Sequence, residues 1–103
     1  MADFVTVAQL SAIEPGAGLR IEVAGKEISL WNVDGAIYAI EDICTHEEAY
    51  LSEGYVTDNC CVSCPLHGAE FDLKTGKART LPATEPVATY AVRVVGDDVQ
   101  VAV

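Results

Sequence analysis

The sequence predicts a single all-β domain. Short runs in which apolar residues alternate with polar ones recur along the chain, are rich in Val and Ile, and end at turn residues, which is the pattern of strands. No long segment repeats its apolar residues with the period of a helix. The chain has 103 residues, which is enough for one domain, 1–103. Roughly seven or more short strands in one domain most often form a sandwich or a barrel.

The first half of the chain carries four of these runs. A single helical turn is expected at 8–12, after the first run. Asp34-Gly35 predicts a tight hairpin turn between the third run and the fourth, because these residues accept positive φ angles. Trp31 and the tyrosines lie on strand patterns, so we expect them to pack rather than to bind a ligand. The four runs are 4–7, 19–23, 28–31 and 37–40.

The second half contains two more predicted hairpins. The first lies at 54–63, and the second joins 90–94 to 99–103 through Gly96-Asp97. The chain is therefore expected to consist of short strands joined by tight turns and loops. Further turn and loop residues in this half are Gly76, Pro82 and Pro86.

The chain is strongly acidic, with 16 Asp and Glu residues against 6 Lys and Arg residues and a formal net charge of −10. Such a surface repels nucleic acid and anionic membranes and suits docking onto basic protein surfaces. A solvated acidic face with no docking role is the alternative interpretation. No Lys or Arg occurs between residues 41 and 70. The acids of this segment are Glu41, Asp42, Glu47, Glu48, Glu53, Asp58 and Glu70.

Hydropathy and cysteine content predict a cytoplasmic protein. No apolar run approaches the length that crosses a bilayer, and the N-terminal residues lack the basic and apolar regions of a signal peptide. In a reducing compartment, the 4 cysteines favour metal binding or catalysis over a disulfide framework. A disulfide that involves Cys60 or Cys61 is the weaker alternative.

Both histidines of the chain lie close to a cysteine. Cys44-Thr45-His46 supplies one thiolate and one imidazole, and Cys64-Pro65-Leu66-His67 supplies a second pair. The segment between them contains the predicted hairpin at 54–63, so the two loops could converge on one site. The candidate metal ligands are therefore Cys44, His46, Cys64 and His67.

Two Cys and two His suit two kinds of metal site. Zinc accepts them in a tetrahedron, whereas a 2Fe–2S cluster takes two Cys on one iron and two His on the other. Structural zinc usually uses Cys-x-x-Cys pairs, and Cys61-Val62-Ser63-Cys64 has that spacing, but a zinc site that used it would leave another candidate ligand unused. The same motif could be a dithiol redox pair, although the strand-to-helix setting of thioredoxin-like sites is missing.

The two loops resemble the cluster-binding loops of Rieske proteins. Their order and spacing match, as do Pro65 after the second Cys and Gly68 after the second His. The resemblance covers most of the chain and is strongest to the Rieske ferredoxins of bacterial aromatic-ring-hydroxylating dioxygenase systems. It implies three antiparallel sheets, a small cluster-binding subdomain at approximately 41–81, and one 2Fe–2S cluster per chain.

Four positions depart from other Rieske proteins. The extra cysteines that form a disulfide in respiratory members are replaced by Ala49 and Leu66, so that bridge is absent. The hydroxyl donors that high-potential members place near the cluster are replaced by Ala69 and Phe71. The resemblance therefore implies a potential near the low end of the Rieske range, and we expect Cys60 and Cys61 to be ordinary residues.

The resemblance implies an electron carrier rather than an enzyme. A mononuclear iron site of the usual kind needs two His and a carboxylate, and both His are already assigned to the cluster. We therefore expect a monomer that transfers electrons from a flavoprotein ferredoxin reductase to a terminal oxygenase, which selects the aromatic substrate. The small Rieske subunit of another oxidoreductase, such as a nitrite reductase, is the alternative; a zinc-stabilised binding module is the third.

Overall fold

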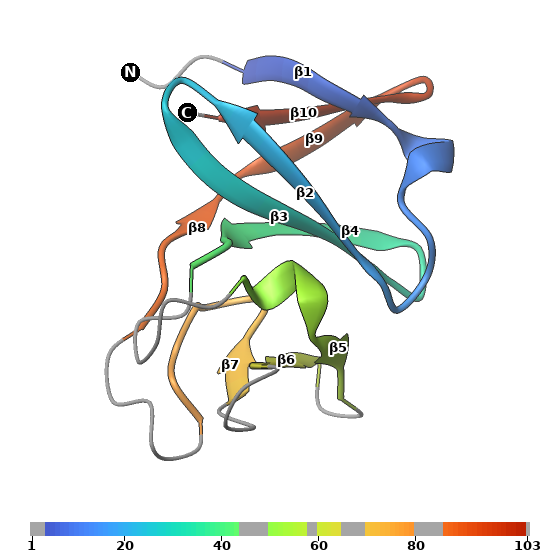
Figure 1. Cartoon of the computed structure of the whole chain (residues 1–103). Coiled ribbons are helices and arrows are strands. Elements are labelled where there is room, and N and C mark those ends of the chain that lie inside the picture. Colours follow the sequence, from blue (N-terminus) through green and yellow to red (C-terminus); the bar gives the residue numbers. More distant parts are fainter. Residues whose placement is uncertain (1–3, 44–49, 58–59, 65–69, 80–85, 103) are drawn as a thin grey trace.

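The computed structural model describes residues 4–43, 50–57, 60–64, 70–79 and 86–102, and these residues form three antiparallel sheets. Figure 1 shows the three sheets one above the other. The two larger sheets lie above and the smallest lies below, on the other side of the middle sheet. The predicted all-β fold with three antiparallel sheets is confirmed. Among the described residues, no helix has the length and apolar character needed to span a membrane.

The middle sheet has the strand order β2-β3-β4-β8. The predicted turn at Asp34-Gly35 joins β3 to β4, with φ angles of 52° and 89°. Ala24 and Gly25 form a second turn of this kind, between β2 and β3, with φ angles of 52° and 75°. The strands are β2 (Gly18–Val23), β3 (Lys26–Val33), β4 (Ala36–Glu41) and β8 (Thr89–Tyr90).

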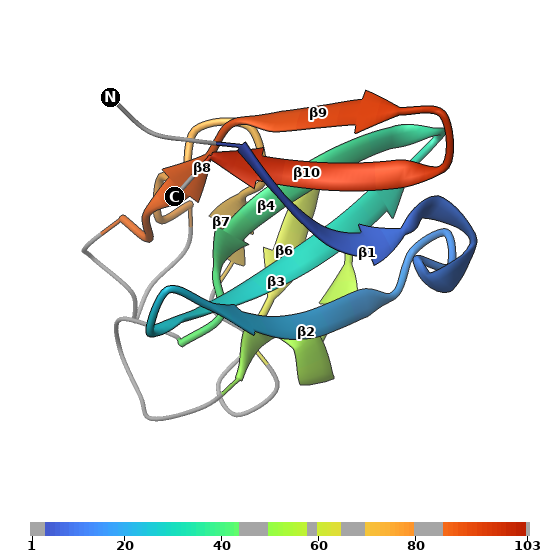
Figure 2. The ribbon, with the colours of Figure 1, turned by 90° about the horizontal axis from the view of Figure 1, so that it is seen from above.

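The upper sheet joins the two ends of the chain, in the order β1-β10-β9. Figure 2 shows its strands β9 and β10 from above, lying over the middle sheet. The predicted run at 90–94 is two strands, because the chain leaves the middle sheet after β8 and enters the upper sheet at β9. The predicted helical turn is the short 3-10 helix η1 (Leu10–Ala12). The strands are β1 (Phe4–Gln9), β9 (Val92–Val95) and β10 (Asp98–Ala102).

The lower sheet is small and has the order β5-β6-β7. Its strands β5 (Tyr55–Val56) and β6 (Cys61–Ser63) form the predicted hairpin at 54–63, and β7 (Glu70–Asp72) pairs with β6. A second 3-10 helix, η2 (Leu51–Glu53), precedes β5. This part of the chain is inserted between β4 and β8, so both of its connections run to the middle sheet.

Two apolar cores lie on opposite faces of the middle sheet. Strand β3 has both faces buried, so Ile28 and Leu30 enter the upper core and Trp31 enters the lower one. Trp31 is fully buried, which confirms its predicted packing role, and its indole Nε1 donates to Ser29 Oγ over 2.8 Å. The buried residues of the lower core are Trp31, Ile40, Leu51, Val62, Cys64, Phe71, Leu73 and Val87.

Candidate metal centre

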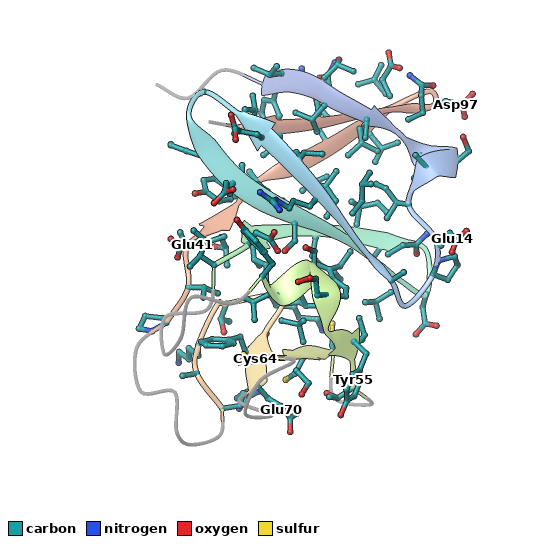
Figure 3. The ribbon with its side chains drawn as sticks, in the orientation of Figure 1. Glu14, Glu41, Tyr55, Cys64, Glu70 and Asp97 are labelled. Carbon is teal, nitrogen blue, oxygen red and sulfur yellow. The ribbon has the colours of Figure 1, made fainter. Side chains whose placement is uncertain are left out.

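One of the four predicted ligands lies in the described part of the chain. Cys64 directly follows β6 in the lower part of the molecule (Figure 3). It is 2% exposed and belongs to the lower core with Leu51 and Phe71. A thiol at the border of an apolar core is shielded from bulk water on that side. The other three predicted ligands, Cys44, His46 and His67, lie outside the described residues.

Each predicted ligand loop begins and ends at an antiparallel residue pair. Ile43 pairs with Tyr50, and the segment 44–49 between them carries the first Cys and His. Ser63 pairs with Glu70, and the segment 64–69 between them carries the second Cys and His. The two segments are equal in length, and each has both of its ends held by main-chain pairing.

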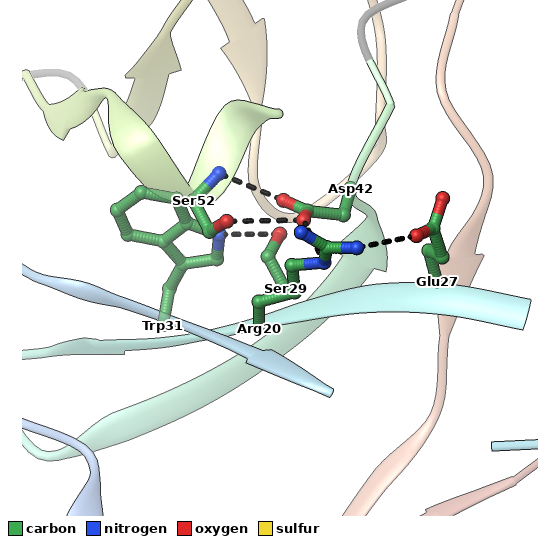
Figure 4. Close-up of polar contacts among 6 residues, drawn as sticks. All are labelled: Arg20, Glu27, Ser29, Trp31, Asp42 and Ser52. Carbon is green, nitrogen blue, oxygen red and sulfur yellow. Dashed lines mark hydrogen bonds and ion pairs between the residues drawn. The ribbon is translucent and has the colours of Figure 1, made fainter. Parts of the chain in front are cut away.

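The first loop is closed further by Asp42, which is fully buried. Its main-chain carbonyl accepts a hydrogen bond from Leu51 N over 2.6 Å. Its carboxylate accepts from Ser52 N at 2.7 Å and from Ser52 Oγ at 3.0 Å (Figure 4). Burial raises the pKa of Asp42 above its ordinary value, against the Ser52 hydrogen bonds and the nearby Arg20 guanidinium.

The burial of Asp42 corrects one expectation from the sequence. Asp42 was expected among the surface acids near the ligand loops, but none of its side chain is exposed. Of the other acids in that segment, Glu53 is exposed and Glu41 and Glu70 are half-buried. Glu47, Glu48 and Asp58 lie outside the described residues.

The second loop begins beside Gly54, the residue that follows the helix η2. The backbone of Gly54 lies so close to β6 that a Cβ there would overlap the carbonyl oxygen of Ser63, the residue before Cys64. Gly54 N also donates to Leu51 O over 2.9 Å, so the end of η2 is fixed at this contact. The base of the second loop is therefore held against the end of η2, the helix that begins directly after the pair closing the first loop.

Cys61 and Cys64 do not present their thiols to one point. Cys64 packs in the lower core with Val62, whereas Cys61 lies on the side of β6 that faces Asp72 and Arg79. Burial raises the pKa of the Cys61 thiol, and Asp72 adds to that effect while Arg79 opposes it. This placement does not suit a zinc site or a dithiol pair built on the Cys-x-x-Cys spacing.

No disulfide joins any two of the described cysteines, Cys60, Cys61 and Cys64. Cys61 is buried, and Cys60 is half-buried against the lower core. Cys60 has a φ of 58°, which breaks the alternation of a strand at that residue. Burial, together with the neighbouring Cys60, raises the pKa of Tyr38.

Two residues near the loop bases were not singled out from the sequence. Ser52 fixes Asp42, and Arg20 lies beside Asp42. Ser52 and Arg20 come from different elements and carry no local motif. Gly54 was expected only as the start of the hairpin at 54–63, and the structure shows that it also allows the end of η2 to approach β6.

The chain is similar to ferredoxins of aromatic dioxygenase systems. It is 52% identical over 87 residues to the 3-phenylpropionate/cinnamic acid dioxygenase ferredoxin subunit of Escherichia coli strain K12, which covers 84% of this chain and 81% of that protein. It superposes on the ferredoxin of carbazole 1,9a-dioxygenase from Nocardioides aromaticivorans IC177 with a TM-score of 0.93, at 36% identity and 98% coverage of both chains.

The chain also matches a chain in a solved complex of oxygenase and ferredoxin in carbazole 1,9a-dioxygenase. The match has 34% identity and a TM-score of 0.88, and it covers 96% of this chain and 92% of the matched chain. The model of the Rieske [2Fe-2S] domain matches residues 3–91. The described geometry fits that cofactor, since the buried thiol of Cys64 begins the second of two equal loops whose sequences together hold two Cys and two His. The chain belongs to the Rieske [2Fe-2S] domain family.

Proposed function

We propose that this chain transfers one electron at a time from a flavin-dependent ferredoxin reductase to the terminal oxygenase of an aromatic-ring dioxygenase system. The proposed ligands of its single 2Fe–2S cluster are Cys44, His46, Cys64 and His67. The observation that carries the proposal is the pair of equal loops, each closed by an antiparallel pair and each containing one Cys and one His.

The donor set explains why a thiolate and an imidazole are needed in each loop. When bound, the cluster accepts and releases one electron, and neutral imidazoles in place of two thiolates raise its potential. The burial of Cys64 keeps bulk water from its sulfur on the side of the lower core. His46 and His67 would provide the route to a partner, if their imidazole edges reach the surface.

The chain itself supplies no site for oxygen chemistry in this proposal. Both of its histidines are assigned to the cluster, so substrate hydroxylation takes place on the oxygenase. We further propose that the chain acts as a monomer in the cytoplasm, that it binds its two partners transiently, and that residues 41–81 form its cluster-binding part.

Small subunits of nitrite reductases share this fold, so the fold alone does not select the partner. The 52% identity to a dioxygenase ferredoxin subunit favours the oxygenase. A zinc-stabilised module is the least supported function, because the match to the Rieske [2Fe-2S] domain favours a cluster on the same two Cys and two His, and Cys61 and Cys64 lie on different sides of β6.

Replacement of the ferredoxin subunit in the 3-phenylpropionate/cinnamic acid dioxygenase system of Escherichia coli tests the proposed partner. The purified chain, reduced by dithionite, is mixed with that terminal oxygenase, and reoxidation is followed by absorbance. We expect reoxidation within seconds for the wild-type protein and none for Cys64→Ser. Reoxidation by a nitrite reductase catalytic subunit but not by the oxygenase would contradict the proposal.

A further inference from the structure

The 3-10 helix η2 contacts the bases of both proposed ligand loops. Its first residue, Leu51, follows the Ile43–Tyr50 pair that closes the first loop. Gly54, directly after η2, lies against Ser63, where the second loop begins. Leu51 and Cys64 also share the lower core. A shift of η2 would therefore change the position of one loop relative to the other.

Asp42 holds η2 from the side of the first loop. Its main-chain carbonyl accepts a hydrogen bond from Leu51 N over 2.6 Å. Its carboxylate accepts two more from Ser52, over 2.7 and 3.0 Å (Figure 4). Because the carboxylate is fully buried, water does not compete for these hydrogen bonds. A buried carboxylate without partners would be strongly destabilising, so the positions of Asp42 and Ser52 depend on each other.

Arg20, on β2, contacts residues on both sides of the first loop. Its Nε lies 3.8 Å from Asp42 Oδ2, before the loop, and its guanidinium stacks 3.8 Å from the ring centroid of Tyr50, after the loop. Its Nη2 donates to Glu27 Oε1 over 2.7 Å, which fixes the guanidinium on the middle sheet. The two ends of the loop are thereby tied to β2 and β3 as well as to each other.

Gly54 holds the other side of η2. Its Cβ position is already occupied by the carbonyl oxygen of Ser63, so any other residue would push η2 away from β6. Close packing on the opposite side prevents η2 from yielding, because a Cβ at Gly18 would come within 2.9 Å of Ser52 Cα and 2.7 Å of the Trp31 ring.

We infer that Asp42 and Gly54 are positioning residues for the cluster, which act by holding η2 between the two ligand loops. Asp42 fixes the loop of Cys44 and His46 to η2, and Gly54 fixes η2 to the strand that leads into Cys64 and His67. This inference rests on the proposed set of four ligands.

Loss of the cluster from the holoprotein tests the role of Asp42. The variants Asp42→Ala, Ser52→Ala and Asp42→Asn are challenged with the iron chelator bathophenanthroline disulfonate, well below their unfolding temperatures. We expect Asp42→Ala to lose iron about tenfold faster than the wild type or more, and Ser52→Ala to be intermediate. Asp42→Asn should stay within about threefold, because its amide can accept from Ser52 N and donate to Ser52 Oγ.

The EPR spectrum of the reduced holoprotein separates positioning from general stability. We expect shifted g-values in Asp42→Ala and Gly54→Ala, because one ligand pair moves relative to the other. Val101→Ala is the matched control, since Val101 is fully buried in the upper core, whereas Cys64 belongs to the lower core. It should lower the unfolding temperature without changing the spectrum.

Three outcomes would overturn the inference. Asp42→Ala could release iron at the wild-type rate, Gly54→Ala could keep the wild-type g-values, or Asp42→Ala could behave like Val101→Ala, with lower stability and an unchanged spectrum. Failure of the proposed function is distinguishable from all three. A wild-type protein without a Rieske-type EPR signal would refute the proposed cluster, and a wild-type protein that has this signal but is not reoxidised by the oxygenase would refute the proposed partner.

Discussion

Asp72, at the end of β7, organises the turn that follows the second ligand loop. Its Oδ1 accepts from Lys74 N at 2.7 Å and from Thr75 N at 3.2 Å, and its Oδ2 accepts from Arg79 Nη2 at 2.9 Å. Burial alone would raise the pKa of Asp72, but these three hydrogen bonds outweigh it and hold the pKa below the ordinary carboxyl value.

The lowered pKa of Asp72 predicts a pH-dependent contribution to stability. An acid with a depressed native pKa stabilises the fold in full above its unfolded pKa, and this contribution is lost as the pH falls through the native pKa. We expect Asp72→Asn to lower the free energy of unfolding by about 1–2 kcal/mol near neutral pH. The difference from the wild type should shrink as the pH falls to about 3.

Denaturant unfolding of both proteins across this pH range is the measurement. Asp97→Asn, at an exposed acid in the turn between β9 and β10, is the control and should follow the wild type. A stability difference for Asp72→Asn that stays constant from neutral to acidic pH would count against the role given to Asp72.

The absence of a hydroxyl at Phe71 predicts a low reduction potential for the 2Fe–2S cluster. Phe71 is fully buried on β7 and shares the lower core with Cys64, but it has no hydroxyl to donate to a cluster sulfur. We therefore expect a potential near the low end of the Rieske range, roughly −150 mV. Phe71→Tyr and Ala69→Ser should raise it, since added donors stabilise the more negative reduced cluster.

Protein-film voltammetry measures this potential directly. Phe71→Leu is the matched control, because it alters the packing beside Cys64 without adding a donor. A positive potential for the wild-type protein, or an equal rise for Phe71→Leu and Phe71→Tyr, would refute the explanation by missing hydroxyls.

Residues differ in how far their roles can be predicted from the sequence. The ligand candidates were found because Cys and His recur in two short motifs, and their ligation of the cluster stays a prediction. Asp42 was assigned to the surface because composition counts a charge without showing its burial. Its partner Ser52 follows the first ligand loop, and only the folded chain shows that the two meet.

At the scale of elements, Gly76 fixes the turn after β7 to the segment before β8. Gly76 N donates to Asp72 O over 2.7 Å, and Gly76 O accepts from Val87 N over 2.8 Å. Its φ is 78°, and a Cβ there would overlap the carbonyl oxygen of Val87. Both the backbone angle and the lack of space therefore require glycine.

A comparison of two glycine substitutions separates the cost of the backbone angle from the cost of the missing space. Gly25 has a similar φ of 75°, but a Cβ there would meet no atom within 4 Å. We expect Gly25→Ala to cost about 1 kcal/mol of unfolding free energy, and Gly76→Ala roughly 2 kcal/mol or more. Thermal unfolding followed by circular dichroism gives both values. Equal losses in the two variants would mean that the contact with Val87 contributes nothing.

Turn chemistry explains which elements were predictable. Asp34-Gly35 and Gly96-Asp97 carry recognised hairpin signals, and both turns are present. The turn at Ala24-Gly25 was missed because Ala has no preference for positive φ. The run at 90–94 was taken as one strand because its alternation continues past Ala91, where the chain passes from the middle sheet to the upper one.

At the scale of the whole molecule, the net charge of −10 predicts salt-dependent docking. The part of the chain around the ligand loops is not uniformly acidic, since Lys74, Lys77 and Arg79 are exposed there. With Asp42 buried, the predicted acidic docking surface depends on other acids of that segment. Those that remain exposed or lie outside the described residues are Glu47, Glu48, Glu53 and Asp58.

Stopped-flow electron transfer to the terminal oxygenase tests this surface. The rate should fall as salt is added, because screening weakens electrostatic steering, and Glu47→Gln with Glu48→Gln should reduce the salt dependence. Glu14→Gln and Asp97→Asn, which lie away from Cys64 in Figure 3, are the controls and should leave it unchanged. If the electron-transfer rate changes neither with salt nor with the Glu47 and Glu48 substitutions, these acids serve solubility alone.

Coordination of the cluster by two histidines is the central claim, and pulsed EPR of the dithionite-reduced protein tests it most directly. Nitrogen hyperfine couplings report imidazoles bound to the iron. We predict couplings from two nitrogens, which disappear from the normal signal when His46 or His67 is replaced and persist in Cys60→Ser and Cys61→Ser. A signal without nitrogen couplings, or a protein that holds zinc and gives no signal, would contradict the account.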